Sequence, residues 1–557
     1  MTHIGLPWAW AWVSLAVMIL LSLWILFREA LQTTVLIERP PKISKFTLNT
    51  QMKRRLLLSI RAVMALLFIV LISVGFIGNP IPERNLSIVL TWTLWWSGLV
   101  VAVFFTGSFW CAICPWDTIA SWLVKRKIFY RSGQPYSLEY KVPAGFRNLL
   151  VASFLVVLLT WFELGYGITV SPYATSIMAL GFVVAATVSM LIFERKAFCQ
   201  YFCPVGRTIG MYSELSIVAL RPIDTEVCAT CNTLECYHGN ELIEPCPTHQ
   251  VMGRMQSNAS CISCAQCVFS CPHTNVAWKT LRFDDVLLKA KRHNMSQSIF
   301  LLILLSLTLL HGLTMLPVWE YWINSVATWS NDSGRLMFSF TLLMMALIVM
   351  VLSAVIFVHW VSMKLLYTSL QNSHTLLQSP NRLREKQKLY QWLGSSQQQL
   401  SEQQGPKQQR MIHDNSLPDN LSFRLFFNFS FATLAITFAY HIAHNVTHLS
   451  SEVRNLGPLL LNPFGTDLKP LSASAMLAMH ESMVVKTFIN ILQSSLIVVA
   501  FAIGLKVILV QAKKILLTTG IDKKISFLFL MPSIILLLFL ASCCLWLLTQ
   551  PMMMRTV

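Results

Sequence analysis

Eight cysteines between positions 228 and 271 are the residues whose types and spacing most clearly predict chemistry. The last four are Cys261, Cys264, Cys267 and Cys271, and Pro272 follows them in a C-x2-C-x2-C-x3-C-P run. In the bacterial ferredoxins that show this spacing, three thiolates hold one iron–sulfur cluster and the fourth serves a neighbouring cluster. The run therefore predicts a [4Fe–4S] cluster.

The other four cysteines precede this run and predict a second cluster. In two-cluster ferredoxins the fourth cysteine of each run binds the other run's cluster. The expected ligands are therefore Cys228, Cys231, Cys236 and Cys271 for the first cluster, and Cys261, Cys264, Cys267 and Cys246 for the second. Structural zinc sites, which also use four thiolates, are the alternative, although the terminal run is a poor zinc spacing.

The upstream run is longer than the downstream one. Four residues separate Cys231 from Cys236, and nine separate Cys236 from Cys246. The insertion contains Tyr237, His238 and Gly239, and we expect it to form an enlarged loop. Such a loop changes the solvent exposure of the first cluster and therefore its reduction potential.

Two further cysteine pairs, each ending in Cys-Pro, lie upstream: Cys111 and Cys114, and Cys199 and Cys203. We expect both at the cytoplasmic ends of membrane helices, where four thiols can bind another metal centre or act as a redox-active dithiol pair. The basic residues Arg195, Lys196 and Arg207 are expected to lower the pKa of these thiols and favour thiolates. Ordinary buried cysteines at helix ends are the alternative.

Histidines in the C-terminal part form a further candidate site. His441, His444 and His448 are spaced i, i+3 and i+7, so they share one helical face. His480 lies in a similar stripe that is rich in methionine. Imidazole and thioether ligands suit copper, and paired imidazoles from facing helices suit haem b. Haem b, copper and a purely structural role at the water boundary all remain open.

Several isolated ionisable residues fall within or beside apolar segments. His311 and His359 lie at positions where they could bind haem groups that carry electrons across a bilayer. Glu163 and Glu320 are expected near outer helix ends, where they either handle protons or a quinol or act as interfacial anchors. Cys543 and its neighbour Cys544 are expected to be packing residues.

The composition indicates a polytopic membrane protein. Of the 557 residues, 55% are hydrophobic and only 12% are charged, whereas soluble proteins carry about 25% charged residues. The net charge of +18 comes from Lys and Arg between the apolar segments, which is typical of loops on the cytoplasmic side. A nucleic-acid partner is therefore not expected.

Ten apolar segments are long enough to span a bilayer. They are 8–27, 56–78, 87–107, 148–168, 176–193, 297–318, 336–361, 425–447, 484–508 and 526–548. The basic loops alternate with loops of little positive charge, so the positive-inside rule places both termini outside. The cysteines between 228 and 271 then lie in the cytoplasm, where thiolates stay reduced. We expect a multi-pass protein of a bacterial inner membrane.

These observations predict a mostly α-helical membrane protein of about ten transmembrane helices with a cytoplasmic, ferredoxin-like α+β module. The expected divisions are a five-helix membrane domain (1–193), a 2[4Fe–4S] domain (194–296), two helices (297–361), a polar cytoplasmic linker (362–424) and a three-helix membrane domain (425–557). The linker is expected because residues 372–420 are rich in Gln and Ser.

Residues 56–295 resemble the NapH/NosR/CcoG class of membrane polyferredoxins, which combine paired Cys-Pro motifs at helix ends with a two-cluster ferredoxin domain. The class motif is C-x3-C-P; Cys199 and Cys203 match it, and the pair at Cys111 and Cys114 is one residue shorter. The chain shows neither an evident flavin-binding domain of the NosR kind nor a C-terminal all-β domain of the CcoG kind.

The resemblance implies a role in electron transfer. Members of this class pass electrons between the quinone pool or a cytoplasmic reductant and a redox enzyme or a metal-centre maturation partner. A quinol dehydrogenase or metal reductase component is the corresponding enzymatic expectation. The alternative is a copper- or other metal-handling membrane protein with an iron–sulfur reductase module.

Overall fold

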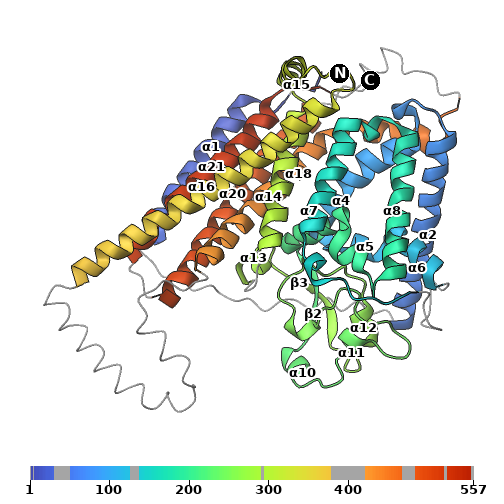
Figure 1. The fold of residues 1–557 in the computed structure, drawn as a ribbon, viewed down its shortest axis with the longest axis horizontal. Coiled ribbons are helices and arrows are strands. Elements are labelled where there is room, and N and C mark those ends of the chain that lie inside the picture. Colours follow the sequence, from blue (N-terminus) through green and yellow to red (C-terminus); the bar gives the residue numbers. More distant parts are fainter. Residues whose placement is uncertain are drawn as a thin grey trace.

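The computed structural model describes residues 2–3, 5–29, 50–125, 137–289, 294–377, 421–466, 483–519 and 523–553. Long helices form a bundle, and a smaller cysteine-rich module, residues 218–280, lies at one end of it (Figure 1). The two chain ends lie together at the opposite end of the molecule (Figure 1). A short antiparallel ladder there pairs β1 (Thr2–His3) with β4 (Met552–Met553).

Each of the ten predicted apolar segments overlaps a helical segment, although 297–318 runs past the end of α14 (Met295–Leu313) into the next helix. Eight of those described are long and apolar enough to cross a membrane. They are α2 (Thr50–Ile77), the continuous run α3–η2–α4 (Leu86–Ile88, Val89–Trp95, Trp96–Thr106), α8 (Pro172–Ile192), α14 (Met295–Leu313), α16 (Met337–Leu377), α18 (Leu421–Leu461), α20 (Met483–Thr519) and α21 (Lys523–Thr549). Two shorter apolar helical segments are α1 (Trp8–Glu29), and α7 (Leu150–Thr160) with η4 (Trp161–Tyr166).

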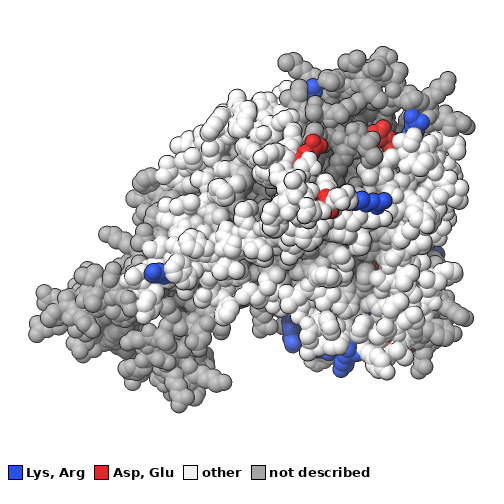
Figure 2. Space-filling model, turned by 45° about the horizontal axis from the view of Figure 1, so that its top comes forward, with Lys and Arg blue, Asp and Glu red and all other residues white. Residues whose placement is uncertain are grey.

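Burial separates the inner helices from the outer ones. Within their apolar windows, 83% of the α18 residues and 72% of the α14 residues are buried, against 11% in α2. The centre of the bundle is therefore built on α14 and α18. Charged side chains are sparse on the described part of the face in Figure 2, as expected for a surface that contacts lipid.

Local sequence explains several helix ends. The side chain of Asn294 accepts a hydrogen bond from the Ser296 N–H, and Gln297 completes a capping box at the start of α14. Helix α8 begins with Ser171 as its cap and Pro172 in its first turn, where the missing proline N–H costs nothing.

Some predicted boundaries are wrong. Helix α16 continues past residue 361 to Leu377, and α18 continues past residue 447 to Leu461, because a helix already formed extends into polar sequence. The expected polar linker at 362–424 therefore begins and ends as helix, and its residues 378–420 lie outside the described part. The expected outer loop at 319–335 contains α15 (Pro317–Ser330), another helix that the apolar pattern did not reveal.

Short helices in the cysteine-bearing loops were also not predicted. After α4 come α5 (Phe109–Ile113) and α6 (Pro115–Lys125), and α6 packs on α8. The second Cys-Pro pair is followed by α9 (Pro204–Tyr212), which is buried along its whole length. In the view of Figure 1, α5 lies between the bundle and the cysteine-rich module.

The cysteine-rich module is held by one antiparallel ladder. Strand β2 (Val218–Pro222) pairs with β3 (Val276–Thr280), and Leu220 lies opposite Trp278. Between the strands, the chain forms α10 (Thr225–Ala229), α11 (Glu235–His238) and α12 (Gln266–Ser270). Asp284, which follows β3, forms an ion pair with Lys506 of α20, so the module is tied to the bundle.

Candidate redox site

The structure brings the eight module cysteines together in two sets of four. Cys236 interacts electrostatically with Cys228, Cys231 and Cys271. Cys246 interacts with each of the three cysteines Cys261, Cys264 and Cys267. We call these the first set (Cys228, Cys231, Cys236, Cys271) and the second set (Cys246, Cys261, Cys264, Cys267). Cys267 also interacts with Cys236, so the two sets are adjacent.

Each set receives its fourth cysteine from the other run through the same kind of turn. Three residues after Cys246 and after Cys271, His249 and Thr274 have φ of 55° and 46°, in the left-handed region. One residue later, the N–H of Gln250 and of Asn275 donates to the sulfur of the respective cysteine at 3.3 Å. Repeated backbone geometry therefore positions two equivalent thiols.

The third cysteine of each run is also positioned in the same way. Leu234 and Ala265 are left-handed N-caps, and they start α11 and α12. Cys236 and Cys267 are the second residues of these helices. The extra residues of the upstream run follow α11 as the loop 239–245. Gly239 lies in this loop as predicted, whereas Tyr237 and His238 belong to the helix.

The two sets differ in what surrounds them. Around the first set, Ala229, Thr230, Asn232 and Thr233 are all exposed. No residue from 261 to 270 in the second set is exposed, and Cys264 packs against the main hydrophobic core. Burial raises the pKa of Cys264 to about 12. In the first set, hydrogen bonds from the Leu234 N–H and then Thr233 lower the pKa of Cys231.

The four cysteines of the Cys-Pro pairs form a third set (Cys111, Cys114, Cys199, Cys203). Cys111 interacts electrostatically with the other three, and all four line one small cavity of about 20 Å³. Cys199 lies in a π-helical turn, η6 (Phe198–Phe202), and the sulfur of Cys203 accepts the Gly206 N–H at 3.2 Å. Single π-helical turns occur frequently at functional sites.

Arg207 lies between the second and third sets. Its guanidinium interacts with Cys261 of the second set and with Cys111, Cys199 and Cys203 of the third. The side chain is buried, and Nη1 donates to the Ala259 carbonyl at 3.1 Å. Its Nε and Nη2 groups have no hydrogen-bond partner among the described residues.

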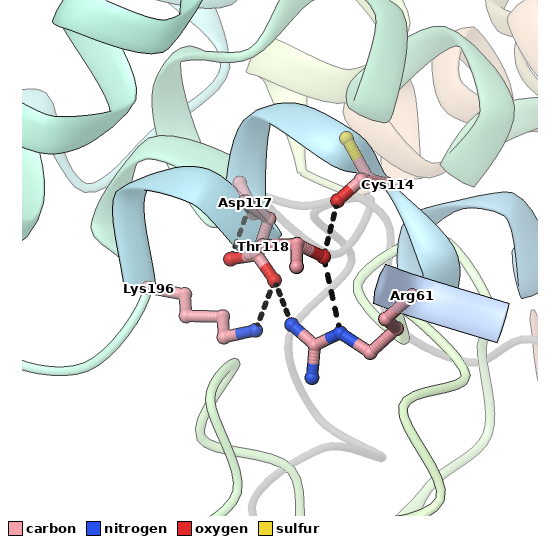
Figure 3. A network of polar contacts seen from close by, with 6 residues as sticks. Arg61, Cys114, Asp117, Thr118 and Lys196 are labelled. Atoms are coloured by element: carbon pink, nitrogen blue, oxygen red, sulfur yellow. Dashed lines mark hydrogen bonds and ion pairs between the residues drawn. The ribbon is translucent and has the colours of Figure 1, made fainter. Parts of the chain in front are cut away.

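A buried ion-pair network supports the third set (Figure 3). The Asp117 carboxylate accepts from Lys196 Nζ at 2.5 Å and from Arg61 Nη2 at 2.8 Å. Arg61 Nε also donates to Thr118, whose hydroxyl donates to the Cys114 carbonyl. Removal of one partner from a buried ion pair typically costs about 3–5 kcal/mol. Three segments far apart in the sequence are therefore fixed beside these cysteines.

The expectation that basic neighbours keep the third set ionised is wrong. Burial raises the pKa of all four thiols, and it raises those of Cys114 and Cys203 to about 12. Lys196 and Arg207 act in the opposite direction, but desolvation outweighs them. Arg195 is engaged elsewhere, because it donates to the Cys246 carbonyl and lies over the Tyr237 ring.

A larger cavity of about 400 Å³ adjoins the third set within the bundle. Trp110, Trp116 and Val205 line both cavities. The walls of the larger cavity come from α2, α8 and α14 together with two π-helical segments, η2 and η4. The indole N–H groups of Trp95, Trp110 and Trp116 are buried and have no hydrogen-bond partner among the described residues.

Ionisable residues from three elements meet at the same cavity. Glu163 of η4, His311 of α14 and His441 of α18 all line it. Glu163 Oε2 and His311 Nε2 are 3.7 Å apart, and the rings of His311 and His441 have centroids 6.5 Å apart. His441 Nδ1 is hydrogen-bonded to the hydroxyl of Tyr212 at 2.8 Å. Neither this tyrosine nor Asp117 was predicted as a site residue.

Other predicted site residues lie apart from this cluster or cannot be placed. His444 is buried, with its ring 6.0 Å from that of Tyr440. The side chain of His448 and the whole of His480 lie outside the described residues, so the predicted histidine site is untested. His359 is hydrogen-bonded to Ser422, and Glu320 is exposed on α15. Cys544 is packed in the core and its neighbour Cys543 is partly buried.

Comparisons with known proteins do not assign a family. No family model matches the chain. An uncharacterized protein of Methanocaldococcus jannaschii is 24% identical over 203 residues, which are 36% of this chain and 74% of that protein. No solved structure matches.

The described cysteines do not form a compact site for a single metal ion. In the part of the chain that the structure describes, no three His, Cys, Asp or Glu side chains are close enough together to hold one metal ion. A cubane cluster is wider than one ion, so its four sulfur ligands stand farther apart. Amide N–H groups directed at the sulfurs, as at Cys246 and Cys271, are among the features that tune iron–sulfur clusters.

Proposed function

We propose that this chain is a membrane-bound electron-transfer protein that exchanges electrons between a cytoplasmic iron–sulfur module and a quinone held between its helices. The observation that supports this most strongly is the order of the sites. The first set adjoins the second, Arg207 links the second to the third, and the third shares lining residues with the 400 Å³ cavity.

The first and second sets would each hold one [4Fe–4S] cluster. Each set offers four thiols, and the exposed surroundings of the first suit exchange with a soluble partner at the membrane surface. The second is enclosed beside the bundle, where exchange with groups inside the membrane is favoured. When bound, each cluster supplies one-electron chemistry.

The larger cavity suits a quinone. Ligand cavities of this size are mostly apolar, with a few polar groups that fix the orientation of the ligand. Tryptophan N–H groups at Trp95, Trp110 and Trp116 can donate to quinone carbonyls, and apolar residues of α2 and α8 line the cavity. Oxidation of a quinol releases two electrons and two protons, so one-electron centres must carry the electrons away singly and proton acceptors are needed.

The groups that would take those protons are Glu163, His311 and His441. They lie along the cavity, and ionisable residues inside membrane segments commonly form proton relays. The hydrogen bond between the Tyr212 hydroxyl and His441 Nδ1 fixes the orientation of the His441 ring. Glu163 is next to its partner His311, so the pair can pass a proton without charging an isolated residue.

Electron exchange with a short-chain quinone tests this proposal. The protein, purified without oxygen, should contain iron and acid-labile sulfide, and decylubiquinol or a menaquinol analogue should reduce its clusters, or the oxidised quinone should reoxidise them. Glu163→Gln should slow that exchange by about 100-fold or more, because acid–base catalysis contributes this much. EPR spectroscopy after rapid mixing measures the rate.

The matched control is Glu320→Gln, the same change at an exposed glutamate. It should leave the rate unchanged, and both variants should keep the iron content and the dithionite-reduced EPR signal. Zinc in place of iron, or no electron exchange with quinone in either direction, would contradict the proposal.

A further inference from the structure

The third set consists of four thiols, which is a composition typical of metal-binding sites. It is separate from the eight cysteines of the module. Two segments distant in sequence each supply a pair of thiols, and the four side chains line one small cavity. Each pair ends in proline, and α6 or α9 begins at that proline. The other two cysteines among the described residues, Cys543 and Cys544, lie on α21 in a different part of the bundle.

The charges around this set are unbalanced. Lys196 and Arg61 pair with a single carboxylate, Asp117. Arg207 adds a third positive charge, and two of its buried N–H groups have no hydrogen-bond partner among the described residues. Buried positive charge is unfavourable unless anionic groups lie nearby. A negatively charged ligand at the third set would supply them.

We infer that Cys111, Cys114, Cys199 and Cys203 bind a third iron–sulfur cluster, whose negative charge the surrounding cations balance. A cluster coordinated by four thiolates is an anion, so it fits a site that has an excess of cations. It is preferred to a single ion because no three of these side chains meet at single-ion distances among the described residues.

The position of such a cluster gives it a role. Cys264 of the second set interacts with Lys196, which also interacts with Cys199 of the third. On the other side, Trp110 and Trp116 separate the third set from the large cavity, whose walls they share. The third cluster would carry one electron at a time between the second cluster and the quinone. The inference adds this step to the proposed function.

Iron stoichiometry tests the inference directly. Three [4Fe–4S] clusters give about 12 irons per chain and two give about 8. We expect about 12 in the anaerobically purified protein and about 8 in Cys111→Ser/Cys203→Ser, with sulfide changing in parallel. Cys543→Ala/Cys544→Ala is the matched double-cysteine control and should keep about 12.

An EPR redox titration of the wild type, which should show three cluster signals, keeps the inference testable if the double-serine protein does not fold. Asp117→Asn preserves the shape of a side chain that interacts with Cys114 and Cys199, and it removes one negative charge. It should shift the midpoint potential of one EPR signal to a more positive value and leave the other two in place. About 8 irons in the wild type, with no third signal, would overturn the inference and leave the proposed function standing. An absence of iron would overturn both.

Discussion

The first and second cysteine sets are built by the same local geometry and placed in different surroundings. Both use a left-handed residue before a short helix and a Cys-Pro turn with an amide N–H directed at the sulfur. The first set is bordered by exposed residues such as Thr230 and Asn232, whereas the second packs against the helix bundle through Cys264. Local sequence therefore makes a thiol set, and its tertiary surroundings decide what the set can exchange electrons with.

Removal of ligand pairs is the strongest test of this difference. Cys228→Ser/Cys231→Ser should lose about 4 irons and keep electron exchange between quinone and the remaining module cluster. Cys264→Ser/Cys267→Ser should lose the same amount of iron but isolate the first cluster, because the second set lies between it and the bundle. Iron analysis and quinol-driven EPR signals distinguish the two variants.

The asymmetry between these variants is the informative result. If both double variants keep, or both lose, quinol reduction of the surviving module cluster, then the two sets do not work in series. A soluble reductant such as dithionite should still reduce the remaining cluster in each variant, which shows that the cluster itself is intact.

Sensitivity to oxidants should also separate the two sets. A soluble oxidant such as ferricyanide reaches exposed clusters first, so the signal that Cys228→Ser/Cys231→Ser abolishes should decay first in the wild type. The decay of both EPR signals and the release of iron are followed over time in one sample. In denaturant both signals should decay together, and equal decay in the folded protein would mean that the surroundings do not protect the second set.

The helices and the grouping of the module cysteines could be predicted from the sequence for different reasons. Apolar segments report helices directly, because each must satisfy its backbone hydrogen bonds internally in lipid. The spacing of the cysteines is specific to the turns that bring them together. In the structure, the cysteines near Cys236 and near Cys267 are those of the predicted first and second sets. Whether these sets bind iron remains a prediction.

The parts that the sequence did not predict depend on packing between distant segments. Arg61 lies within an apolar segment and Asp117 lies two residues after a Cys-Pro element, and ionisable residues in such places are signals of function. The pairing of Asp117 with both Arg61 and Lys196 could not be read from spacing, because three separate segments must meet. The predicted lowering of the pKa of the third-set thiols was wrong for the same reason. Burial raises these pKa values, and burial depends on tertiary packing.

The finest difference between the sets is one side-chain hydrogen bond. Asn275 and Gln250 occupy equivalent positions, but only the Asn275 side chain donates to a sulfur, that of Cys228, at 3.4 Å. The Gln250 amide donates to the Thr248 carbonyl instead. Because hydrogen bonds to ligand sulfurs stabilise the reduced, more negative cluster, Asn275→Ala should make the potential of the first cluster more negative. Gln250→Ala should leave both potentials unchanged in an EPR redox titration, and equal shifts in the two variants would show that the side-chain contact has no electronic effect.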